Sequence, residues 1–230
     1  MEQKFYVLRQ GEERYNVDYY EKNEMLAVKG NRDHQFYSVK PLRFFVRRRQ
    51  RADMLWAPLH ALFISNRLHL IFKEAGITGY DALPADAKLV YEHSSDESVY
   101  WQVAITGWGG IASNTVVNLN RESLDCSYVY LQSEGTGDSF DRSRWDGSDF
   151  FIVWPHSGCY CVTQRVVELL KENKIKHYAI NELKTYTFGE ISGAIAPRPL
   201  RCIFSEERAK TIGEPLGIYW WEAKKNWWDK

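Results

Sequence analysis

Two stretches of the chain share one pattern of apolar and polar positions. Residues 64–80 read ISNRLHLIFKEAGITGY, and residues 162–178 read VTQRVVELLKENKIKHY, 98 positions later. In each stretch the apolar residues recur three and four positions apart, as on one face of an α-helix. Each also opens on a hydroxyl residue, Ser65 or Thr163, whose oxygen can accept a hydrogen bond from the free amides of a first helical turn. The pattern predicts two helices that begin near these residues.

Each predicted helix leads into a predicted strand. After a two-residue linker, Ile77–Tyr80 and Ile175–Ile180 are rich in the β-branched and aromatic residues typical of strands. The sequence therefore predicts one helix-strand unit that is used twice, at about residues 55–95 and 145–185. Between the units, residues 79–87 contain Pro84, and we expect a turn or loop there.

Other segments predict a strand-rich protein. The uninterrupted apolar run Phe150–Val153 is typical of a strand that is buried on both faces, and residues 1–50 contain short β-rich segments separated by charged turns. We therefore expect an α/β (α+β) fold, with a mixed sheet body built from two similar helix-strand units and a strand-rich N-terminal segment. With 230 residues the chain is long enough for a core without disulfides or metal, and we expect 1–230 to form a single compact body.

Composition narrows the class of protein. The chain has 44% hydrophobic residues, but no apolar run approaches the roughly 20 residues of a membrane helix, and the first residues lack the pattern of a secretory signal. We expect a cytoplasmic protein that does not bind a membrane. Its isoelectric point of about 7.0 and the absence of a dense basic run argue against nucleic-acid binding.

Charge is unevenly distributed along the chain. Residues 51–150 carry 7 Lys/Arg against 14 Asp/Glu, whereas both ends are mildly basic. The segment 133–151, SEGTGDSFDRSRWDGSDFF, contributes to this excess and has the composition of an exposed acidic loop. Such a loop fits a basic cleft on a partner, and its aromatic residue can anchor the contact. The residues that we expect to bind a partner are Glu134, Asp138, Asp141, Trp145 and Asp146.

The search for catalytic and metal-binding motifs gives weak candidates. The sequence has no GxSxG, HExxH, CxxC or Walker motif. Asp146 and Asp149 are three apart and could serve acid–base chemistry, but a turn that enters a buried strand uses the same residues to satisfy backbone amides. Cys159 and Cys161 lie near His156, yet structural zinc usually needs four ligands in closer pairs. We expect no metal and no cofactor.

The tail YWWEAKKNWWDK places tryptophans at helical spacing, because Trp220, Lys224 and Trp227 share one line. This pattern is typical of a terminal helix that packs on the protein's body, so we expect these tryptophans to dock. A partner groove and a membrane interface are the other interpretations.

The segment WDGSDFF, followed by a strand and by VTQRVVELLKENKIKHYAINEL, is similar to the myxobacterial double-CxxCG paralogous family and related bacterial immunity proteins. The similarity covers about residues 60–190 and lacks both CxxCG pairs, so a zinc site held by those cysteines is not implied. The residues that carry it are Gly147, Ser148, Asp149, Phe150, Phe151, Thr163 and Arg165, with Ser65, Arg67, Gly76, Ile77, Gly79 and Tyr80 in the first unit.

This resemblance implies a non-enzymatic immunity protein, which binds a cognate toxin domain in the cytoplasm and neutralises it by occluding its active site. Two other interpretations stay open: a small hydrolase centred on Asp146 and Asp149, and a structural interaction module. The patterns specify neither the toxin nor the oligomeric state.

Overall fold

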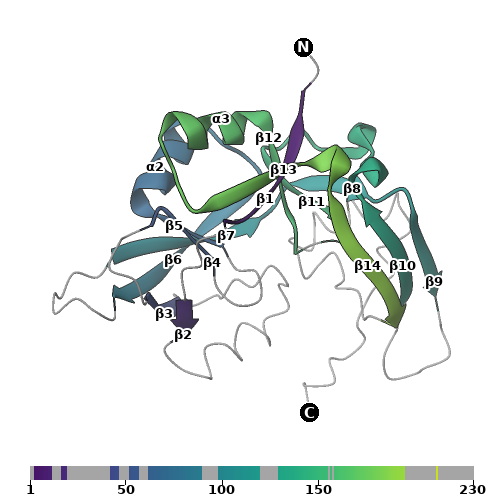
Figure 1. The fold of residues 1–230 in the computed structure, drawn as a ribbon, viewed down its shortest axis with the longest axis horizontal. Coiled ribbons are helices and arrows are strands. Elements are labelled where there is room, and N and C mark those ends of the chain that lie inside the picture. Colours follow the sequence, from purple (N-terminus) through teal and green to yellow (C-terminus); the bar gives the residue numbers. More distant parts are fainter. Residues whose placement is uncertain are drawn as a thin grey trace.

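A computed structural model describes residues 3–11, 17–19, 42–46, 52–56, 62–89, 98–119, 129–154, 156, 158–194 and 211. In these parts the strands form three sheets, and two α-helices lie together at one end of the molecule (Figure 1). The helices are α2 (Asn66–Glu74) and α3 (Gln164–Glu172). The fold is therefore mixed α+β with a high strand content, as predicted.

The sheets contain strands from distant parts of the chain. The six-stranded sheet has the order β2 (Val17–Tyr19), β3 (Leu42–Val46), β6 (Tyr80–Leu89), β7 (Ser98–Ile105), β5 (Leu62–Ser65), β4 (Met54–Trp56). The five-stranded sheet has the order β13 (Tyr178–Glu182), β1 (Phe5–Gln10), β12 (Tyr160–Thr163), β11 (Phe150–Trp154), β8 (Trp108–Ile111). The three-stranded sheet has the order β14 (Thr187–Ala194), β10 (Val129–Thr136), β9 (Thr115–Leu119), and it lies at the far end of the molecule from the helices (Figure 1).

The two helices match the prediction in position and length. Ser65 and Thr163 are the N-cap residues, and each helix has nine residues. Their exits match as well: Gly76 (φ 62°) corresponds to Lys174 (φ 53°), and Gly79 (φ 81°) corresponds to His177 (φ 69°). The left-handed region favours glycine, so the two non-glycine residues hold a conformation that their side chains disfavour. The repeat is thus one backbone path that is used twice.

The repeat extends to strands that its sequence does not reveal. The strands β4-β5-β7-β6 of the first unit correspond in order to β11-β12-β1-β13 of the second. Registers agree as well: Trp101 of β7 lies opposite Ile64 and Pro84, and Tyr6 of β1 lies opposite the corresponding residues, Val162 and Glu182. In the second unit, a strand from the beginning of the chain takes the position that β7 has in the first.

The prediction of a turn or loop at residues 79–87 is wrong, because these residues lie almost entirely in β6 (Tyr80–Leu89). Its pairing partners explain the difference. β6 lies antiparallel to β7 from Tyr80 to Ala87 and parallel to β3 from Ala85 to Leu89. Pro84 lacks an amide proton for the ladder, but it precedes the stretch that pairs with β3, so hydrogen bonding with two neighbours overrides its turn preference.

The main core connects the two units. It contains Leu68 and Phe72 of α2 with Val166 and Leu170 of α3, all 0% exposed. Apolar residues of β4, β5, β11 and β12 complete it. A second core lies on the other face of the five-stranded sheet around Phe151, where residues of β1, β11 and β12 meet residues 140–145 and 183–188. Residues Phe150–Val153 are fully buried, which confirms the prediction for this strand.

The segment 133–151 is not the freely exposed loop that its composition predicted. Its start belongs to β10, and two short 3-10 helices follow, η2 (Gly137–Ser139) and η3 (Arg142–Arg144). Ser139, Ser148 and Asp149 are buried. Aromatic and hydroxyl residues between the acidic ones provide packing and hydrogen bonds that a charge count overlooks. The tryptophans of residues 219–230 lie outside the described residues.

Within the described residues, neither helix is long or apolar enough to cross a membrane.

We predict that Phe151→Ala and Phe150→Ala each lower the free energy of unfolding by about 3–5 kcal/mol, because each removes a fully buried ring and leaves a cavity. Denaturant titration of the two variants measures this. Val99→Ala is the control: Val99 is 52% exposed in β7, so its truncation should cost less than about 0.5 kcal/mol. Equal effects at the buried and the exposed position would contradict this assignment of the core.

Candidate functional site

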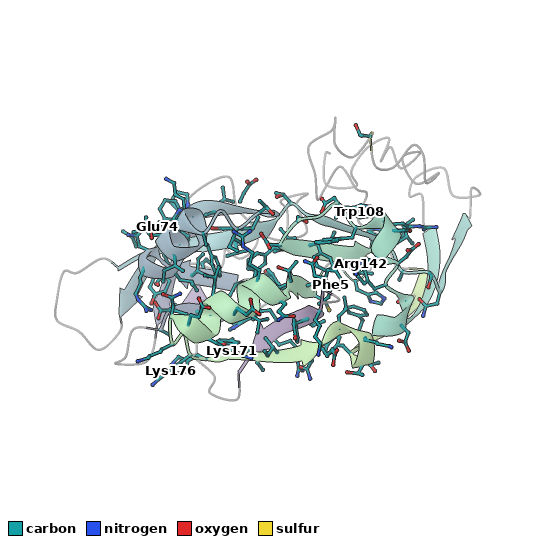
Figure 2. The ribbon with its side chains drawn as sticks, turned by 90° about the horizontal axis from the view of Figure 1, so that it is seen from above. Phe5, Glu74, Trp108, Arg142, Lys171 and Lys176 are labelled. Atoms are coloured by element: carbon teal, nitrogen blue, oxygen red, sulfur yellow. The ribbon has the colours of Figure 1, made fainter. Side chains whose placement is uncertain are left out.

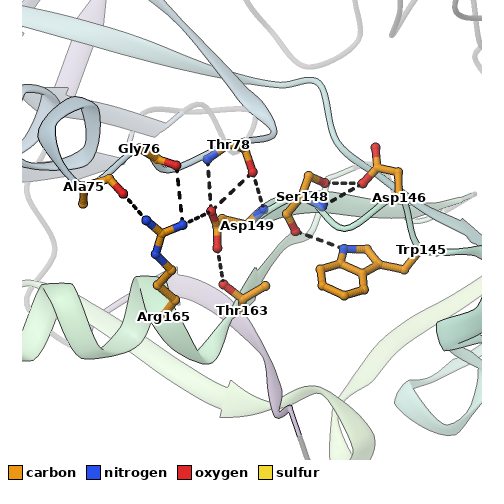
Figure 3. A network of polar contacts seen from close by, with 9 residues as sticks. All are labelled: Ala75, Gly76, Thr78, Trp145, Asp146, Ser148, Asp149, Thr163 and Arg165. Carbon is orange, nitrogen blue, oxygen red and sulfur yellow. Dashed lines mark hydrogen bonds and ion pairs between the residues drawn. The ribbon is translucent and has the colours of Figure 1, made fainter.

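Asp149 lies at the centre of a polar network between the two units (Figure 3). Its carboxylate Oδ1 accepts a hydrogen bond from Thr163 Oγ1 at 2.8 Å. Its Oδ2 accepts from Thr78 N at 3.1 Å, from Thr78 Oγ1 at 3.3 Å and from Arg165 Nη1 at 3.1 Å. Each carboxylate oxygen offers about two lone-pair positions, so three donors crowd Oδ2 while Thr163 alone donates to Oδ1.

Arg165 extends this network across the boundary between the units. It belongs to α3, and its Nη2 donates to the carbonyl of Ala75, the C-cap residue of α2. The carbonyls at a helix C-terminus lack amide partners and carry partial negative charge, so a guanidinium satisfies them well. The side chain of Arg165 is 52% exposed, whereas that of Asp149 is 9% exposed.

The first unit contains the same arrangement. Asp53 precedes β4 as Asp149 precedes β11; it accepts from Ser65 Oγ at 2.7 Å and from Arg67 Nη1 at 2.7 Å. Arg67 also donates through Nη2 to the carbonyl of Asn173 at 2.9 Å, and Asn173 ends α3.

The two arginines therefore form reciprocal contacts. Each is held by an aspartate of its own unit and binds the last turn of the other unit's helix. Ala75 and Asn173 are 98 positions apart, as are Arg67 and Arg165, so the contact has the form of an isologous interface with an internal two-fold axis. Tyr160 adds a further bond across this axis, because its hydroxyl accepts from Leu62 N at 3.2 Å. We call the four residues Asp53, Arg67, Asp149 and Arg165 the reciprocal clamp.

One expectation about the helix caps is wrong. Ser65 caps α2 by accepting from Leu68 N at 3.1 Å, but the hydroxyl of Thr163 makes no cap hydrogen bond to α3. Thr163 is 1% exposed and donates to Asp149 instead. Because Asp149 is buried and needs hydrogen-bond donors, the Thr163 hydroxyl bonds to its carboxylate and not to the first turn of α3.

Asp146 holds the loop that precedes β11. Its Oδ2 accepts from Trp108 N at 2.9 Å, and its Oδ1 accepts from Ser148 N at 3.0 Å and from the Ser148 hydroxyl. These contacts differ from those of Asp149, so the two carboxylates that sequence spacing paired belong to separate networks. Both networks anchor backbone at the entrance to a buried strand.

Asp141 has a local structural role, and Asp138 does not share it. Asp141 caps η3 by accepting from the amide and the hydroxyl of Ser143 at 2.9 and 2.7 Å, and it pairs with Arg144 at 3.3 Å. The hydrogen bonds from Ser143, with the charge of Arg144, lower the pKa of Asp141. Asp138 is exposed on η2.

Trp145 fixes this segment to the second core. Its ring lies edge-on to Phe5 with centroids 5.0 Å apart, and it contacts Phe151 at 6.0 Å. Its Nε1 donates to the Ser148 carbonyl at 3.0 Å. Glu134 lies in β10 opposite Glu190 of β14, and the structure describes only its backbone. Four of the five predicted binding residues thus belong to one continuous segment, which we call the 137–146 segment.

Two cysteines, Cys159 and Cys161, and the neighbouring His156 lie in largely buried surroundings. Burial raises the pKa of Cys159 to about 11, and it raises the pKa of Cys161 well above the usual value. His156 stacks on Phe188 with centroids 4.7 Å apart, and its burial lowers its pKa to about 4. Among the described residues, no group of three potential ligands is arranged to hold a metal ion.

No protein-family model matches this chain, and no curated protein matches it either.

Sequence reasoning found Asp149, Arg165, Ser65 and Arg67 but missed Asp53. A signal was present: Asp53 precedes Ser65 by 12 residues, and Asp149 precedes Thr163 by 14. The unequal spacing concealed the correspondence.

We predict that Asp149→Asn lowers the free energy of unfolding by about 3 kcal/mol, because the amide presents N–H groups to donors and leaves Arg165 without its buried partner. Asp53→Asn is the matched variant at the corresponding position. The Asp53 side chain is 24% exposed and its arginine is 54% exposed, so this change should cost about 1 kcal/mol. Thermal or denaturant unfolding measures both, and a larger loss at Asp53 would refute the ranking.

Thr163→Ala tests the corrected role of Thr163. It removes a donor from the buried Asp149 carboxylate, and we expect a loss of about 1–3 kcal/mol. Thr163→Ser, which keeps the hydroxyl, should recover most of it. If serine and alanine destabilise equally, the hydrogen bond is not the cause.

Proposed function

We propose that this chain is an immunity protein, which binds a cognate bacterial toxin in the cytoplasm and neutralises it by occluding its active site. The observation that carries the proposal is the 137–146 segment. It combines an exposed carboxylate at Asp138 with a backbone that Trp145, Asp141 and Asp146 hold in place.

Rigidity at this position favours binding. A segment that is already ordered before it meets a partner loses less conformational entropy in the complex, so more of its contact energy appears as affinity. Asp141 orders η3, while Asp146 ties the end of the segment to Trp108 at the start of β8. This anchoring resembles that of other binding surfaces in which a stable scaffold positions a loop.

Charge gives a second argument for a protein partner. The three aspartates at 138, 141 and 146 lie within nine residues that also contain Arg142 and Arg144, and Asp141 pairs with Arg144. Toxins that act on nucleic acids or nucleotides need basic clefts, and acidic residues that approach such a cleft accelerate association. The segment therefore suits a partner with a positively charged active site.

The alternative of a hydrolase centred on Asp146 and Asp149 receives less support from the contacts. A general acid or base needs an oxygen that is within reach of its substrate. Asp149 is largely buried and both its oxygens accept hydrogen bonds from the protein, and Asp146 accepts from Trp108 and Ser148.

The test first identifies a toxin-domain protein among the products of the genes that neighbour this one, and then co-expresses it with this chain. We predict that Asp138→Lys weakens protection and slows complex formation at least tenfold at low salt, while the melting temperature changes by less than about 2 °C, because Asp138 is exposed. Surface plasmon resonance gives the association rate, and growth assays give the protection.

Two further variants separate binding from folding. Glu172→Lys makes the same change of charge at an exposed position of α3 and should leave association unchanged. Asp141→Lys removes the cap of η3 and should reduce both stability and protection. If Asp138→Lys binds and protects like the unmodified chain, the segment does not contact the toxin. Protection without a detectable complex would favour the enzyme.

A further inference from the structure

β13 forms one edge of the five-stranded sheet. Among the described strands its only neighbour is β1, which lies on its inner side. After β13 the chain continues into η4 (Leu183–Thr185), which contacts β1 and η2. Figure 2 shows β13 (light green) along the rim of the molecule, near the labelled Lys176. One side of the β13 backbone is therefore not paired with any described strand.

The register shows which backbone groups of β13 point to its outer side. Gly11 N donates to the His177 carbonyl at 3.4 Å. These two residues face each other, because they continue the register that pairs Arg9 with Ala179. Hydrogen-bonded pairs alternate with non-hydrogen-bonded pairs in an antiparallel ladder, so Ala179 and Asn181 bond to β1. The amides and carbonyls that point outward belong to Tyr178, Ile180 and Glu182.

The corresponding strand of the first unit, β6, has a proline on this side. Pro84 corresponds to Glu182 in the repeat. Its backbone also points outward, because Thr106 N donates to the Gly79 carbonyl at 2.8 Å and the ladder alternates from there. Proline lacks the amide proton that an added strand would use, and it commonly protects exposed edges. β13 keeps an amide at this position and lacks this protection.

The first unit also shows that this side of the sheet accepts a further strand. Beyond Pro84, β6 pairs with β3 from Ala85 to Leu89, on the side away from β7. The corresponding side of β13 has no such neighbour among the described strands. An extended strand can therefore add to β13 through backbone hydrogen bonds, as in other proteins that bind a partner at a sheet edge.

We propose that two copies of this chain form a dimer through their β13 strands, which pair antiparallel around a two-fold axis at Ile180. In this arrangement Ile180 faces itself, and Tyr178 of each copy faces Glu182 of the other. These are the residues whose backbone groups point outward, so the facing pairs exchange about six hydrogen bonds. The contact is self-complementary and closed, as in most protein dimers. It joins the two five-stranded sheets into one.

Charge complementarity favours a second copy as the partner at this edge. Lys176 precedes β13 and Glu182 ends it, and both are exposed. In an antiparallel pair, Lys176 of one copy approaches Glu182 of the other, and this happens at both ends of the contact. The residues between them, Tyr178–Asn181, carry no charge, so no like charges face each other at the axis. Opposite charges on neighbouring strands stabilise a pair, whereas like charges destabilise it.

Hydrogen exchange with residue-resolved detection tests the proposal at about 5 µM and about 500 µM, because dimers form by mass action. Analytical ultracentrifugation gives the oligomeric state under both conditions. We expect dimers at the higher concentration, in which the amides of Tyr178, Ile180 and Glu182 exchange at least about tenfold more slowly than in the monomer. The amides of Ala179 and Asn181, which bond to β1, should be protected at both concentrations.

Glu182→Pro gives β13 the residue that the first unit has at this position. The φ angle of Glu182 is −62°, which proline adopts without strain, so the monomer should keep its fold. We expect this variant to dimerise at least about tenfold more weakly, because the contact loses the Glu182 amide of each copy. Glu182→Gln is the matched control: it removes the charge but keeps the amide, and it should weaken the dimer much less.

A chain that stays monomeric at about 500 µM overturns the proposal. A dimer that Glu182→Pro leaves intact also overturns it, because its contact then lies elsewhere. Protection of the outward amides in the monomer would show that the edge is already covered, and protection that needs another protein would assign the edge to that protein. Either result overturns the proposal.

If Glu182→Pro does not fold, a pair of charge reversals replaces it. Lys176→Glu brings like charges together across the contact and should weaken the dimer. Adding Glu182→Lys to this variant exchanges the two charges and should restore dimerisation. Failure of the double variant to recover the dimer would overturn the pairing of these two ends.

Discussion

The arrangement of the two units depends on the burial of the Asp149 carboxylate. A charge removed from water needs hydrogen-bond partners, and the chain supplies them from both units. Thr78 lies between α2 and β6 of the first unit, and Thr163 and Arg165 belong to the second. Since Arg165 also binds the end of α2, satisfying this charge fixes one helix relative to the other. The corresponding contacts of Asp53 and Arg67 fix them a second time, from the opposite direction.

The apolar cores add stability to this arrangement, while the polar contacts determine how the two helices are oriented relative to each other. Leu68, Phe72, Val166 and Leu170 bury their side chains in one core between the helices and the strands. Apolar contacts have little directional preference, so several orientations of two amphipathic helices could bury similar areas. The reciprocal clamp requires each guanidinium to reach one particular turn. The clamp therefore favours one orientation of the two helices, and Asp149 is its one buried charge.

Local sequence patterns predicted the parts of the fold that depend on contacts between residues close together in the sequence. The spacing of apolar residues located both helices, and the run at Phe150–Val153 located a buried strand. Contacts between distant residues were not predictable in this way. Pro84 suggested a loop, but it lies opposite Trp101 of β7 and directly precedes residues that pair with both β7 and β3, so it is part of a strand. Thr163 has the residue type and the position of a side-chain cap, but its hydroxyl donates a hydrogen bond to the carboxylate of Asp149, 14 positions earlier. The 98-residue repeat did not reveal that β1 completes the second unit, since β1 and β7 share no obvious sequence. In the candidate site, the acidic residues were visible, and the division between anchoring Asp141 and Asp146 and exposed Asp138 was not.

The position of β1 also affects how the protein is made. Translation delivers β1 first, and its neighbours β12 and β13 only when residues 160–182 have been synthesised. At about 5–20 residues per second, the strand waits roughly 10–30 s on the ribosome. Throughout that time, the residues that bury Val7 and Leu8 in the folded protein have not all been synthesised. The second unit therefore completes its sheet only after residues 160–182 have been made, and until then the nascent chain carries an unpaired apolar strand that chaperones can recognise.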